Sequence, residues 1–316
     1  MRTVFVSAIN IGPQSMRIRH ALFLLVAIVV VSGCVRYQPK PLTPSHVETQ
    51  FNSRTLDDAR LKAFIESHSP ESVKEWPRPS WDLNALTLAA FYYHPSLDVA
   101  RSQVGIAAAS VITAGARPNP SLSVAPGYTD SPESPWLFSL SFDLPVETAG
   151  KRSLRIGQAK QLTEAARLTL AEAGWQVRSR LRTALLGHLL ARQTIELLEA
   201  DMTVRSDAVH LMARRFVAGE VSRTEVDAAR TQVVQTRMAL RAAEGQAAES
   251  LVDLAAALGL SPPALEGVVF EWPALDALPT ESEASAETVQ RRGLLNRLDV
   301  RRSLVEYAAA EAALQL

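Results

Sequence analysis

The chain has 316 residues, enough for two ordinary domains. Its 33 lysine and arginine residues equal its 33 aspartate and glutamate residues, and this balance excludes the strongly basic surface typical of nucleic-acid binding. The single cysteine excludes an intramolecular disulfide, and 14 glycines argue against a collagen-like chain.

Residues 1–33 are predicted to be a secretory signal peptide. The basic segment Met16–His20 precedes the apolar run Ala21–Val31, which is short for a membrane span. Two small residues then precede Cys34, an arrangement that resembles the bacterial lipobox, whose cysteine is lipidated, with palmitate among the attached acyl groups, and becomes the mature amino terminus. The alternative is a plain signal peptide with an incidental cysteine.

Two further features of this region bear on processing and export. Met16 is an alternative start to Met1, because residues 1–15 add nothing that a signal peptide requires. Val35 follows the cysteine where some lipoproteins have aspartate, and by resemblance to bacterial lipoproteins this favours export to the outer membrane. Residues 34–81 are rich in proline and polar residues, which predicts a lipidated extended tether with one short helix near Leu56–Glu66.

Residues 82–120 are predicted to form helices, which the family resemblance given below would place in the periplasm. Apolar residues recur at helical spacing over residues 82–116, and Pro95 starts a second helix after a break at His94. The helical pattern stops at Arg117–Pro120, because two prolines cannot continue a helix.

Residues 121–146 change to a period of two and are predicted to form a transmembrane β-hairpin. Ser121–Ala125 alternates and continues less regularly to Tyr128. The second run places a wholly apolar or aromatic set on one face: Trp136, Phe138, Leu140, Phe142 and Leu144. Such a face suits lipid, and the alternative is a half-buried strand of a soluble sheet.

Residues 147–261 are predicted to form a long helical hairpin. Between Val146 and Ser261 there is no proline, although the chain holds 18, and good helix formers dominate. The first arm, about Lys151 to Phe216, would be roughly 100 Å long at 1.5 Å per residue. Its apolar stripe is rich in small residues, which suits close packing as in a coiled coil: Ala159, Leu162, Ala166, Leu170, Ala173, Val177, Leu181 and Ala184.

The turn of this hairpin is predicted at Gly219, which can take a positive φ. Ser222 followed by Glu225 has the spacing of a capping box that opens the returning helix. That helix is expected to end at Gly259, shortly before Pro262.

The rest of the chain repeats an earlier part. Residues 262–285 are predicted to be an equatorial linker, and residues 286–316 the first helix of a second, incomplete repeat. Leu97–Val104 (LDVARSQV) reappears as Leu298–Val305 (LDVRRSLV) at a constant offset, which indicates a duplicated architecture. The predicted fold class is therefore mainly α with a small β part, with one complete repeat and the start of a second.

These features together resemble the outer-membrane factor family, the TolC-like exit ducts of bacterial efflux and secretion systems, from about Trp81 to Leu316. Arg117–Leu122 is similar to the family's helix-to-strand junction. Pro145–Arg152 is similar to its strand-to-helix junction, in the form common in the heavy-metal (CzcC-like) branch. Phe216–Val226 is similar to the tip of its periplasmic hairpin.

The resemblance implies a homotrimer in the outer membrane, lipid-anchored here and extending into the periplasm. In that family each protomer gives four strands to one shared barrel, and long helices form the staves of a hollow α-barrel. The implied function is that of an outer-membrane channel in a tripartite efflux system, a passive duct for metal ions or small toxic compounds. Its implied partners are a periplasmic adaptor and an inner-membrane pump.

The resemblance also implies the site residues. The adaptor contact is expected at the hairpin tip, formed by Val217, Ala218, Gly219, Glu220, Val221, Ser222, Arg223 and Thr224. The alternative is that Gly219 only makes the turn. Glu225 matches a position where the family often has an acid that holds the tip closed, and the alternative role is a capping carboxylate for the returning helix.

No catalytic, cofactor or metal site is predicted. His188 and His210 lie on the same arm, but too far apart for a shared metal ion. We find no nucleophile–base set, phosphate loop or cysteine cluster, so the chain is not expected to be an enzyme. Trp175 is assigned to packing and Arg178, Arg180 and Arg182 to a solvated face, rather than to a ligand site.

Two other functions fit parts of the sequence. A periplasmic adaptor lipoprotein also contains a helical hairpin, but it would need halves of a small β-domain close to that hairpin. A nonfunctional duct remnant would explain why the second repeat stops at Leu316, before any counterpart of the strands. Two strands alone leave open sheet edges, which lipid does not tolerate.

Overall fold

The structure is a computed structural model, and it describes residues 39, 41, 43–70, 75–128, 136–272 and 286–316. Two compact units divide the chain, residues 1–48 and 49–316. The predicted signal peptide and Cys34 lie outside the described residues. Helix α2 (Pro44–Asn52) crosses the boundary between the units and buries none of its residues.

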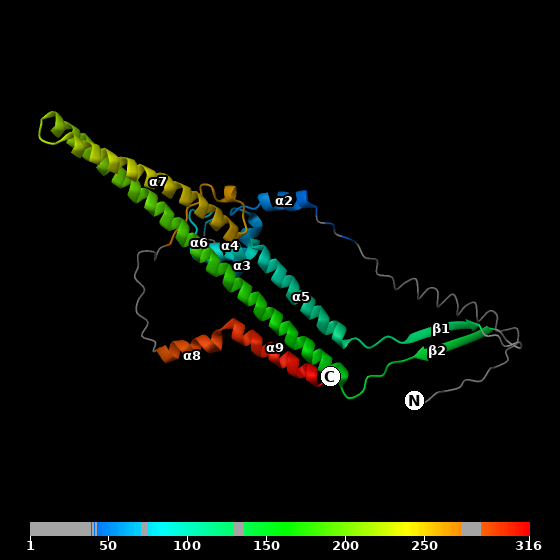
Figure 1. Cartoon of the computed structure of the whole chain (residues 1–316). Coiled ribbons are helices and arrows are strands. Elements are labelled where there is room, and N and C mark those ends of the chain that lie inside the picture. Colours follow the sequence, from blue (N-terminus) through cyan, green and yellow to red (C-terminus); the bar gives the residue numbers. More distant parts are fainter. Residues whose placement is uncertain (1–38, 40, 42, 71–74, 129–135, 273–285) are drawn as a thin grey trace. The chain divides into compact units, whose positions relative to one another are not determined.

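The second unit is dominated by an antiparallel pair of long helices (Figure 1). Helix α6 (Lys151–Val217) has 67 residues, and α7 (Arg223–Leu258) returns beside it for 36 residues. Both arms and the turn lie where the sequence predicts them. At 1.5 Å per residue, α6 is about 100 Å long.

Two shorter helices precede the strands, separated by the predicted break. Helix α4 (Leu83–Tyr93) begins after Asp82, whose carboxylate accepts a hydrogen bond from the backbone N–H of Ala85 at 3.1 Å. His94 ends α4 and caps α5 (Pro95–Gly115), which has proline in its first turn.

The hydrophobic core lies where α4, the middle of α6 and the end of α7 meet. Its fully buried side chains come from segments far apart in the sequence: Leu61, Ile65, Leu86, Leu181, Leu185, Leu254, Leu258 and Leu265. Gly259 ends α7 with φ +76°, and a 3₁₀ helix, η2 (Pro262–Leu265), follows. Trp81 pairs with Phe270 in a parallel bridge, which ties the chain before α4 to the chain after η2.

The extended tether predicted for residues 34–81 is wrong for the part after Arg54. Helix α3 (Ala59–His68) forms there, close to the short helix that the sequence predicts, and Leu56, Leu61 and Ile65 are buried in the core. Burial of these apolar residues favours a folded conformation despite the prolines on either side, because each buried leucine or isoleucine contributes roughly 1.5–3 kcal/mol to the stability of the fold.

The two strands form an antiparallel hairpin, β1 (Ser121–Tyr128) with β2 (Trp136–Asp143). The register pairs Leu122 with Phe142 and Val124 with Leu140, so apolar residues from both strands share one face. Leu144, predicted as part of the strand, lies one residue beyond β2. Residues 129–135, between the two strands, lie outside the described residues.

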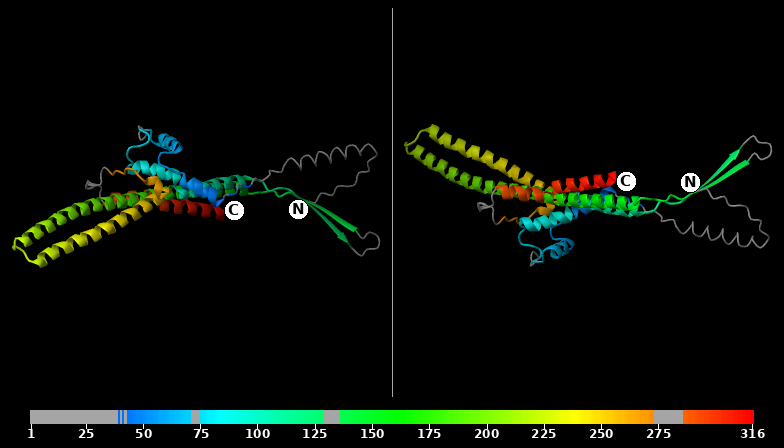
Figure 2. Two further views of the ribbon diagram at one scale, coloured as in Figure 1. Left: turned by 90° about the horizontal axis from the view of Figure 1, so that it is seen from above. Right: turned by 90° about the horizontal axis from the view of Figure 1, so that it is seen from below.

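The last described segment differs in one respect from its prediction. The sequence predicts one helix from Ala286 onward, but the structure has two, α8 (Ala286–Asn296) and α9 (Leu298–Leu314), separated at Arg297. The break repeats the α4–α5 break, because α9 carries the copy of the α5 motif. In both copies the serine hydroxyl donates to the aspartate carbonyl one turn earlier, from Ser102 to Asp98 at 2.8 Å and from Ser303 to Asp299 at 3.0 Å. Both α5 and α9 pack against α6 (Figure 2).

Candidate functional site

The hairpin tip between α6 and α7 is a tight and exposed turn. Gly219 has φ +77°, and its N–H donates to the Phe216 carbonyl at 2.9 Å. The next N–H, of Glu220, reaches back to the Arg215 carbonyl at 2.9 Å, which closes the end of α6. The side chains of Arg215 and Glu220 also form an ion pair at 3.0 Å. Val217 is 87% exposed at this turn, so the tip offers an apolar side chain to a partner.

A complete capping box opens α7 on the other side of the turn. The Ser222 hydroxyl oxygen accepts a hydrogen bond from the Glu225 N–H at 3.3 Å, and the Glu225 carboxylate accepts from the Ser222 N–H at 2.7 Å. The Ser222 N–H and hydroxyl both donate to the Glu225 carboxylate, and these hydrogen bonds, with the nearby Arg215 charge, lower the pKa of Glu225. The capping role of Glu225 is thereby confirmed, and its role in closing a gate stays a prediction.

Polar pairs cross the α6–α7 interface at two levels. Near the tip, Asp201 accepts hydrogen bonds from Arg205 at 2.6 Å and from Thr236 at 3.1 Å, and Arg205 also donates to Gln232 at 3.0 Å. The hydrogen bond from Arg205 lowers the pKa of Asp201. These contacts fix the register of the two arms, because a slip along either helix would separate them.

The second polar level lies nearer the core. His188 Nδ1 lies 3.1 Å from the Ser250 hydroxyl, and both residues are buried. Burial lowers the pKa of His188, and the positive charge of Arg192 lowers it further. Since Phe270 packs edge-on against the His188 ring, this histidine is a core residue.

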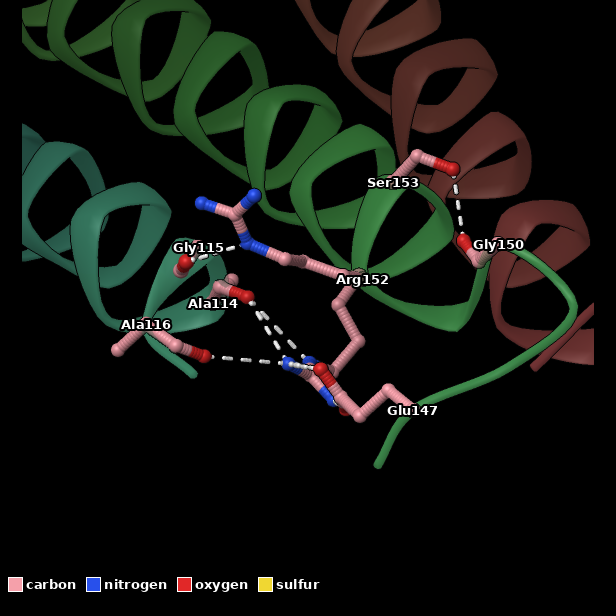
Figure 3. A network of polar contacts seen from close by, with 8 residues as sticks. Ala114, Gly115, Ala116, Glu147, Gly150, Arg152 and Ser153 are labelled. Carbon is pink, nitrogen blue, oxygen red and sulfur yellow. Dashed lines mark hydrogen bonds and ion pairs between the residues drawn. The ribbon is translucent and has the colours of Figure 1, made fainter. Parts of the chain in front are cut away.

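The junction between the strands and the helices is held by two arginines (Figure 3). Helix α5 ends without a glycine cap, and its last carbonyls accept hydrogen bonds from the first turns of α6. Arg152 donates to Gly115 at 2.6 Å, and Arg155 donates to Ala114 at 3.3 Å and to Ala116 at 3.4 Å. Positive charge at this end of α5 is also favoured by the helix dipole.

Glu147 completes this junction. Its carboxylate forms an ion pair with Arg155, and the hydrogen bond from Arg155 lowers the pKa of Glu147 and raises that of Arg155. Figure 3 shows the three segments that meet here: the end of α5, the linker after β2 and the start of α6. Arg155 thus joins the linker that follows β2 to the end of α5, the helix that precedes β1.

The apolar face of the β-hairpin is exposed. Leu122 and Val124 are 66% and 63% exposed, and Leu140 and Phe142 across from them 70% and 66%. Leu144, just beyond β2, is also exposed, and the side chains of Trp136 and Phe138 lie outside the described part. Among the described residues, no helix is both long and apolar enough to cross a membrane.

A family model described as outer membrane efflux protein matches residues 90–260, which is 171 of the 316 residues. The chain belongs to the outer membrane efflux protein family. The match begins in α4 and ends just after α7, so it includes both strands, the junction and the hairpin tip. The resemblance drawn from the sequence is thereby confirmed, and so is the predicted fold class.

Individual members of the outer membrane efflux protein family show the same likeness. The cobalt-zinc-cadmium resistance protein CzcC of Cupriavidus metallidurans is 28% identical over 163 residues, which cover 52% of this chain and 38% of CzcC. The outer membrane protein VceC of Vibrio cholerae has 20% identity and a TM-score of 0.56, with 74% of this chain and 57% of VceC covered.

A third relative, the outer membrane channel CmeC of Campylobacter jejuni, has 15% identity and a TM-score of 0.55, with 88% of this chain and 60% of CmeC covered. At these identities, the two structural likenesses show the fold alone. The chain spans only 38% to 60% of the length of these three relatives.

The predicted tip residues lie together in the structure. The structure also shows contacts at the junction between strands and helices that the sequence does not predict. Val217–Thr224 all lie at the turn, where adaptor contact stays a prediction. In the sequence, Arg155 is visible only as a charge outside the apolar stripe. Its spacing from Arg152 was the available signal, since residues three apart share a helix face. Trp175 is predicted to pack, but it is 63% exposed.

Proposed function

We propose that this chain contributes to an outer-membrane channel of a tripartite efflux system, where it acts as a passive export duct. The observation that carries the proposal is a hairpin far longer than its core requires. On α6 the buried cluster includes only Val177, Leu181 and Leu185, and on α7 only the last turns. Both helices extend well beyond it.

The exposed faces of the hairpin support assembly into a hollow cylinder. Large apolar side chains lie exposed along both arms, among them Leu197, Val204, Val234 and Met238. In a solid globular protein such residues would be buried, whereas staves of a cylinder cover them with neighbouring staves. A homotrimer is the assembly we propose, with β1 and β2 contributing to a shared barrel.

The proposed location is the outer membrane, with the helices in the periplasm and a lipid anchor at Cys34. The apolar face of the β-hairpin supports contact with lipid. The alternative function, a periplasmic adaptor lipoprotein, is not favoured, because the helical hairpin lies within the match to the outer membrane efflux protein family.

The hairpin tip is the proposed contact for a periplasmic adaptor, which would connect the duct to an inner-membrane pump. To test this contact, a photo-crosslinking amino acid is introduced at Val217 in cells, and the crosslinked partner is identified by mass spectrometry. An adaptor protein is the expected product. The same amino acid at Leu162, an exposed apolar position near the other end of α6, is the matched control and is expected to give no adaptor. An adaptor captured equally at both positions would contradict a contact at the tip.

Metal ions are the proposed substrates, on the strength of the identity to CzcC. Deleting the gene from its own organism is expected to lower tolerance to cobalt, zinc or cadmium and to raise the cell-associated metal, measured by mass spectrometry. Restoring the gene is expected to reverse both effects. If tolerance to metals is unchanged but tolerance to organic toxic compounds falls, the duct stands and the metal assignment is wrong. Unchanged tolerance to both classes would contradict the efflux function.

A further inference from the structure

A cavity of about 370 Å³ lies where both copies of the repeated motif meet α6. Leu97 of α5 and Leu298 of α9, equivalent residues of the two copies, both line it. Phe91 of α4 and Leu170 of α6 add further apolar walls, and Gly174 leaves the space open. Four helices therefore bound one small apolar cavity, within the roughly 300–1,000 Å³ typical of ligand sites.

The two charged side chains that line this cavity are both arginines. Arg101 and Arg178 line it, and its described lining contains no carboxylate. Arg101 is held in place by Asp98 at 2.8 Å and by the Phe91 carbonyl at 2.8 Å. Among the described residues, Arg178 has no hydrogen bond or ion pair with another side chain or with the backbone. A guanidinium can pair with an anionic group through two parallel hydrogen bonds.

Glu172 of α6, close in sequence to Trp175, does not line this cavity. It lines a separate cavity with Trp175 and Arg297, and its charge is paired with Arg302 at 2.7 Å. Trp175 and Leu298 line both cavities. An exposed tryptophan beside an apolar cavity also provides a surface for an alkyl or aryl group.

We propose that this cavity binds a small anionic amphiphile, such as an alkyl or aryl carboxylate. Its apolar part would lie among Phe91, Leu97 and Leu298, and its anionic group would pair with Arg178. The ligand would contact α4, α5, α6 and α9 together, so binding would stabilise the packing of both repeat copies on α6. The proposal does not depend on the substrate of the duct.

The test measures binding of octanoate to the purified full chain by isothermal titration calorimetry. The chain is held in nanodiscs of neutral phosphatidylcholine, so that no detergent competes for the cavity. Octan-1-ol and octyltrimethylammonium serve as the neutral and cationic probes of equal chain length. Octanoate is expected to bind at least about tenfold more tightly than octan-1-ol, because a hydrogen-bonded charge is added, and the cationic probe is expected not to bind.

Two variants test separately the contribution of the arginine charge and that of the apolar cavity to binding. Arg178→Gln is expected to weaken octanoate about tenfold and to leave octan-1-ol unchanged. The matched control is Arg237→Gln, which removes an exposed arginine of α7 and is expected to change nothing. Gly174→Leu places a side chain in the cavity and is expected to abolish binding of octanoate and of octan-1-ol, with circular dichroism to show that the helices are intact.

Three results would overturn the proposal. One is absence of octanoate binding to the unchanged chain, and another is equal affinity for octanoate and octan-1-ol. The third is an equal loss in Arg178→Gln and Arg237→Gln, which would show that only net charge matters. Added salt gives an independent readout, since it is expected to weaken octanoate but not octan-1-ol.

Discussion

Gly259 lies in close contact with the break between α4 and α5. Its φ of +76° suits glycine, and a Cβ there would lie 2.9 Å from the Tyr93 carbonyl oxygen and 3.0 Å from His94 Cα. Arg54 donates to the carbonyls of Tyr93 and Gly259 at 3.0 and 2.9 Å, so the break between α4 and α5 is joined to the end of α7. The sequence predicts the glycine stop but not this close approach.

Gly259→Ala is therefore expected to destabilise the chain by about 2–4 kcal/mol, the sum of a left-handed backbone and a clash with α4. Gly245→Ala is the matched control, because Gly245 lies inside α7 and a Cβ added there would meet nothing within 4 Å. It is expected to stabilise by about 0.5–1 kcal/mol. Urea unfolding followed by circular dichroism measures both changes. Similar losses in the two variants would contradict this account.

His188 is expected to make stability depend on pH. Its folded pKa is lowered, so below the unfolded value of about 6.5 the unfolded chain takes up a proton that the folded chain refuses. Stability then falls as the pH drops from about 7.5 to about 5.5. Arg192 of α6 strengthens this effect. Glu196 of α6 and Glu266 after η2 line a groove together with His188, and their negative charges would oppose it.

His188→Gln is expected to reduce the fall in melting temperature between about pH 7.5 and about pH 5.5, because glutamine carries no titrating proton. Part of the fall is expected to remain, since burial also lowers the pKa of His94. The exposed His210, on the same helix, provides the control variant His210→Gln. A pH dependence that His188→Gln leaves intact would show that the buried histidine does not cause it.

At the scale of elements, the α6–α7 interface depends on a few polar contacts among many small residues. Thr236 is buried and donates to Asp201 of the other arm, whereas the exposed Thr231 donates to the Asp227 carbonyl of its own helix. Thr236→Val is expected to cost about 1 kcal/mol, and Thr231→Val less than half of that. Hydrogen exchange of the amides around Asp201 measures the difference. Equal protection in both variants would argue against a fixed register.

The cap of α7 gives a second prediction for this hairpin. Ser222→Ala removes the side-chain acceptor for the Glu225 N–H and is expected to cost about 1 kcal/mol. The loss should be local, with faster hydrogen exchange in the first turn of α7 and unchanged exchange near Leu254. Ser222→Asp keeps an acceptor at this position and is expected to restore protection. If alanine and aspartate behave alike, the capping box does not stabilise this turn.

Elements were more predictable than the contacts between them. The capping box, the glycine turn and the break at His94 are local signals, and all three lie where the sequence places them. The sequence does not reveal the burial of Leu56–Ile65, because the prolines that suggest a tether lie before and after this segment, whereas its burial depends on α4 and the rest of the core. The arginines of the junction were missed for the same reason, since the carbonyls that they bind lie about 40 residues earlier in the chain.

At the scale of the whole molecule, the duplicated motif explains why α6 has related helices on two sides. The constant offset in the sequence predicts the repeat, but it could not show that α5 and α9 share α6 as a partner. The cavity between the two copies forms because α5 and α9 both pack against α6. None of its residues belongs to a sequence motif for ligand binding.

The lipid anchor is a prediction about the whole protein, because Cys34 lies outside the described residues. Cells fed with radiolabelled palmitate are expected to label the chain, and Cys34→Ala is expected to abolish the label and to leave the signal peptide uncleaved at this position. The control is Ser32→Ala, which keeps a small residue before the cysteine. Equal labelling of the Cys34→Ala chain would contradict lipidation at this site.

The continuity of α6 has a mechanical consequence. Its hydrogen-bonded column runs from Lys151 to Val217 without a proline, so the tip and the arginine junction are two ends of one stiff rod. A torque applied at the tip is carried along the backbone to Arg152 and Arg155, and from there to the strand linker through Glu147. The protein can pass a twist over about 100 Å without a relay of moving side chains.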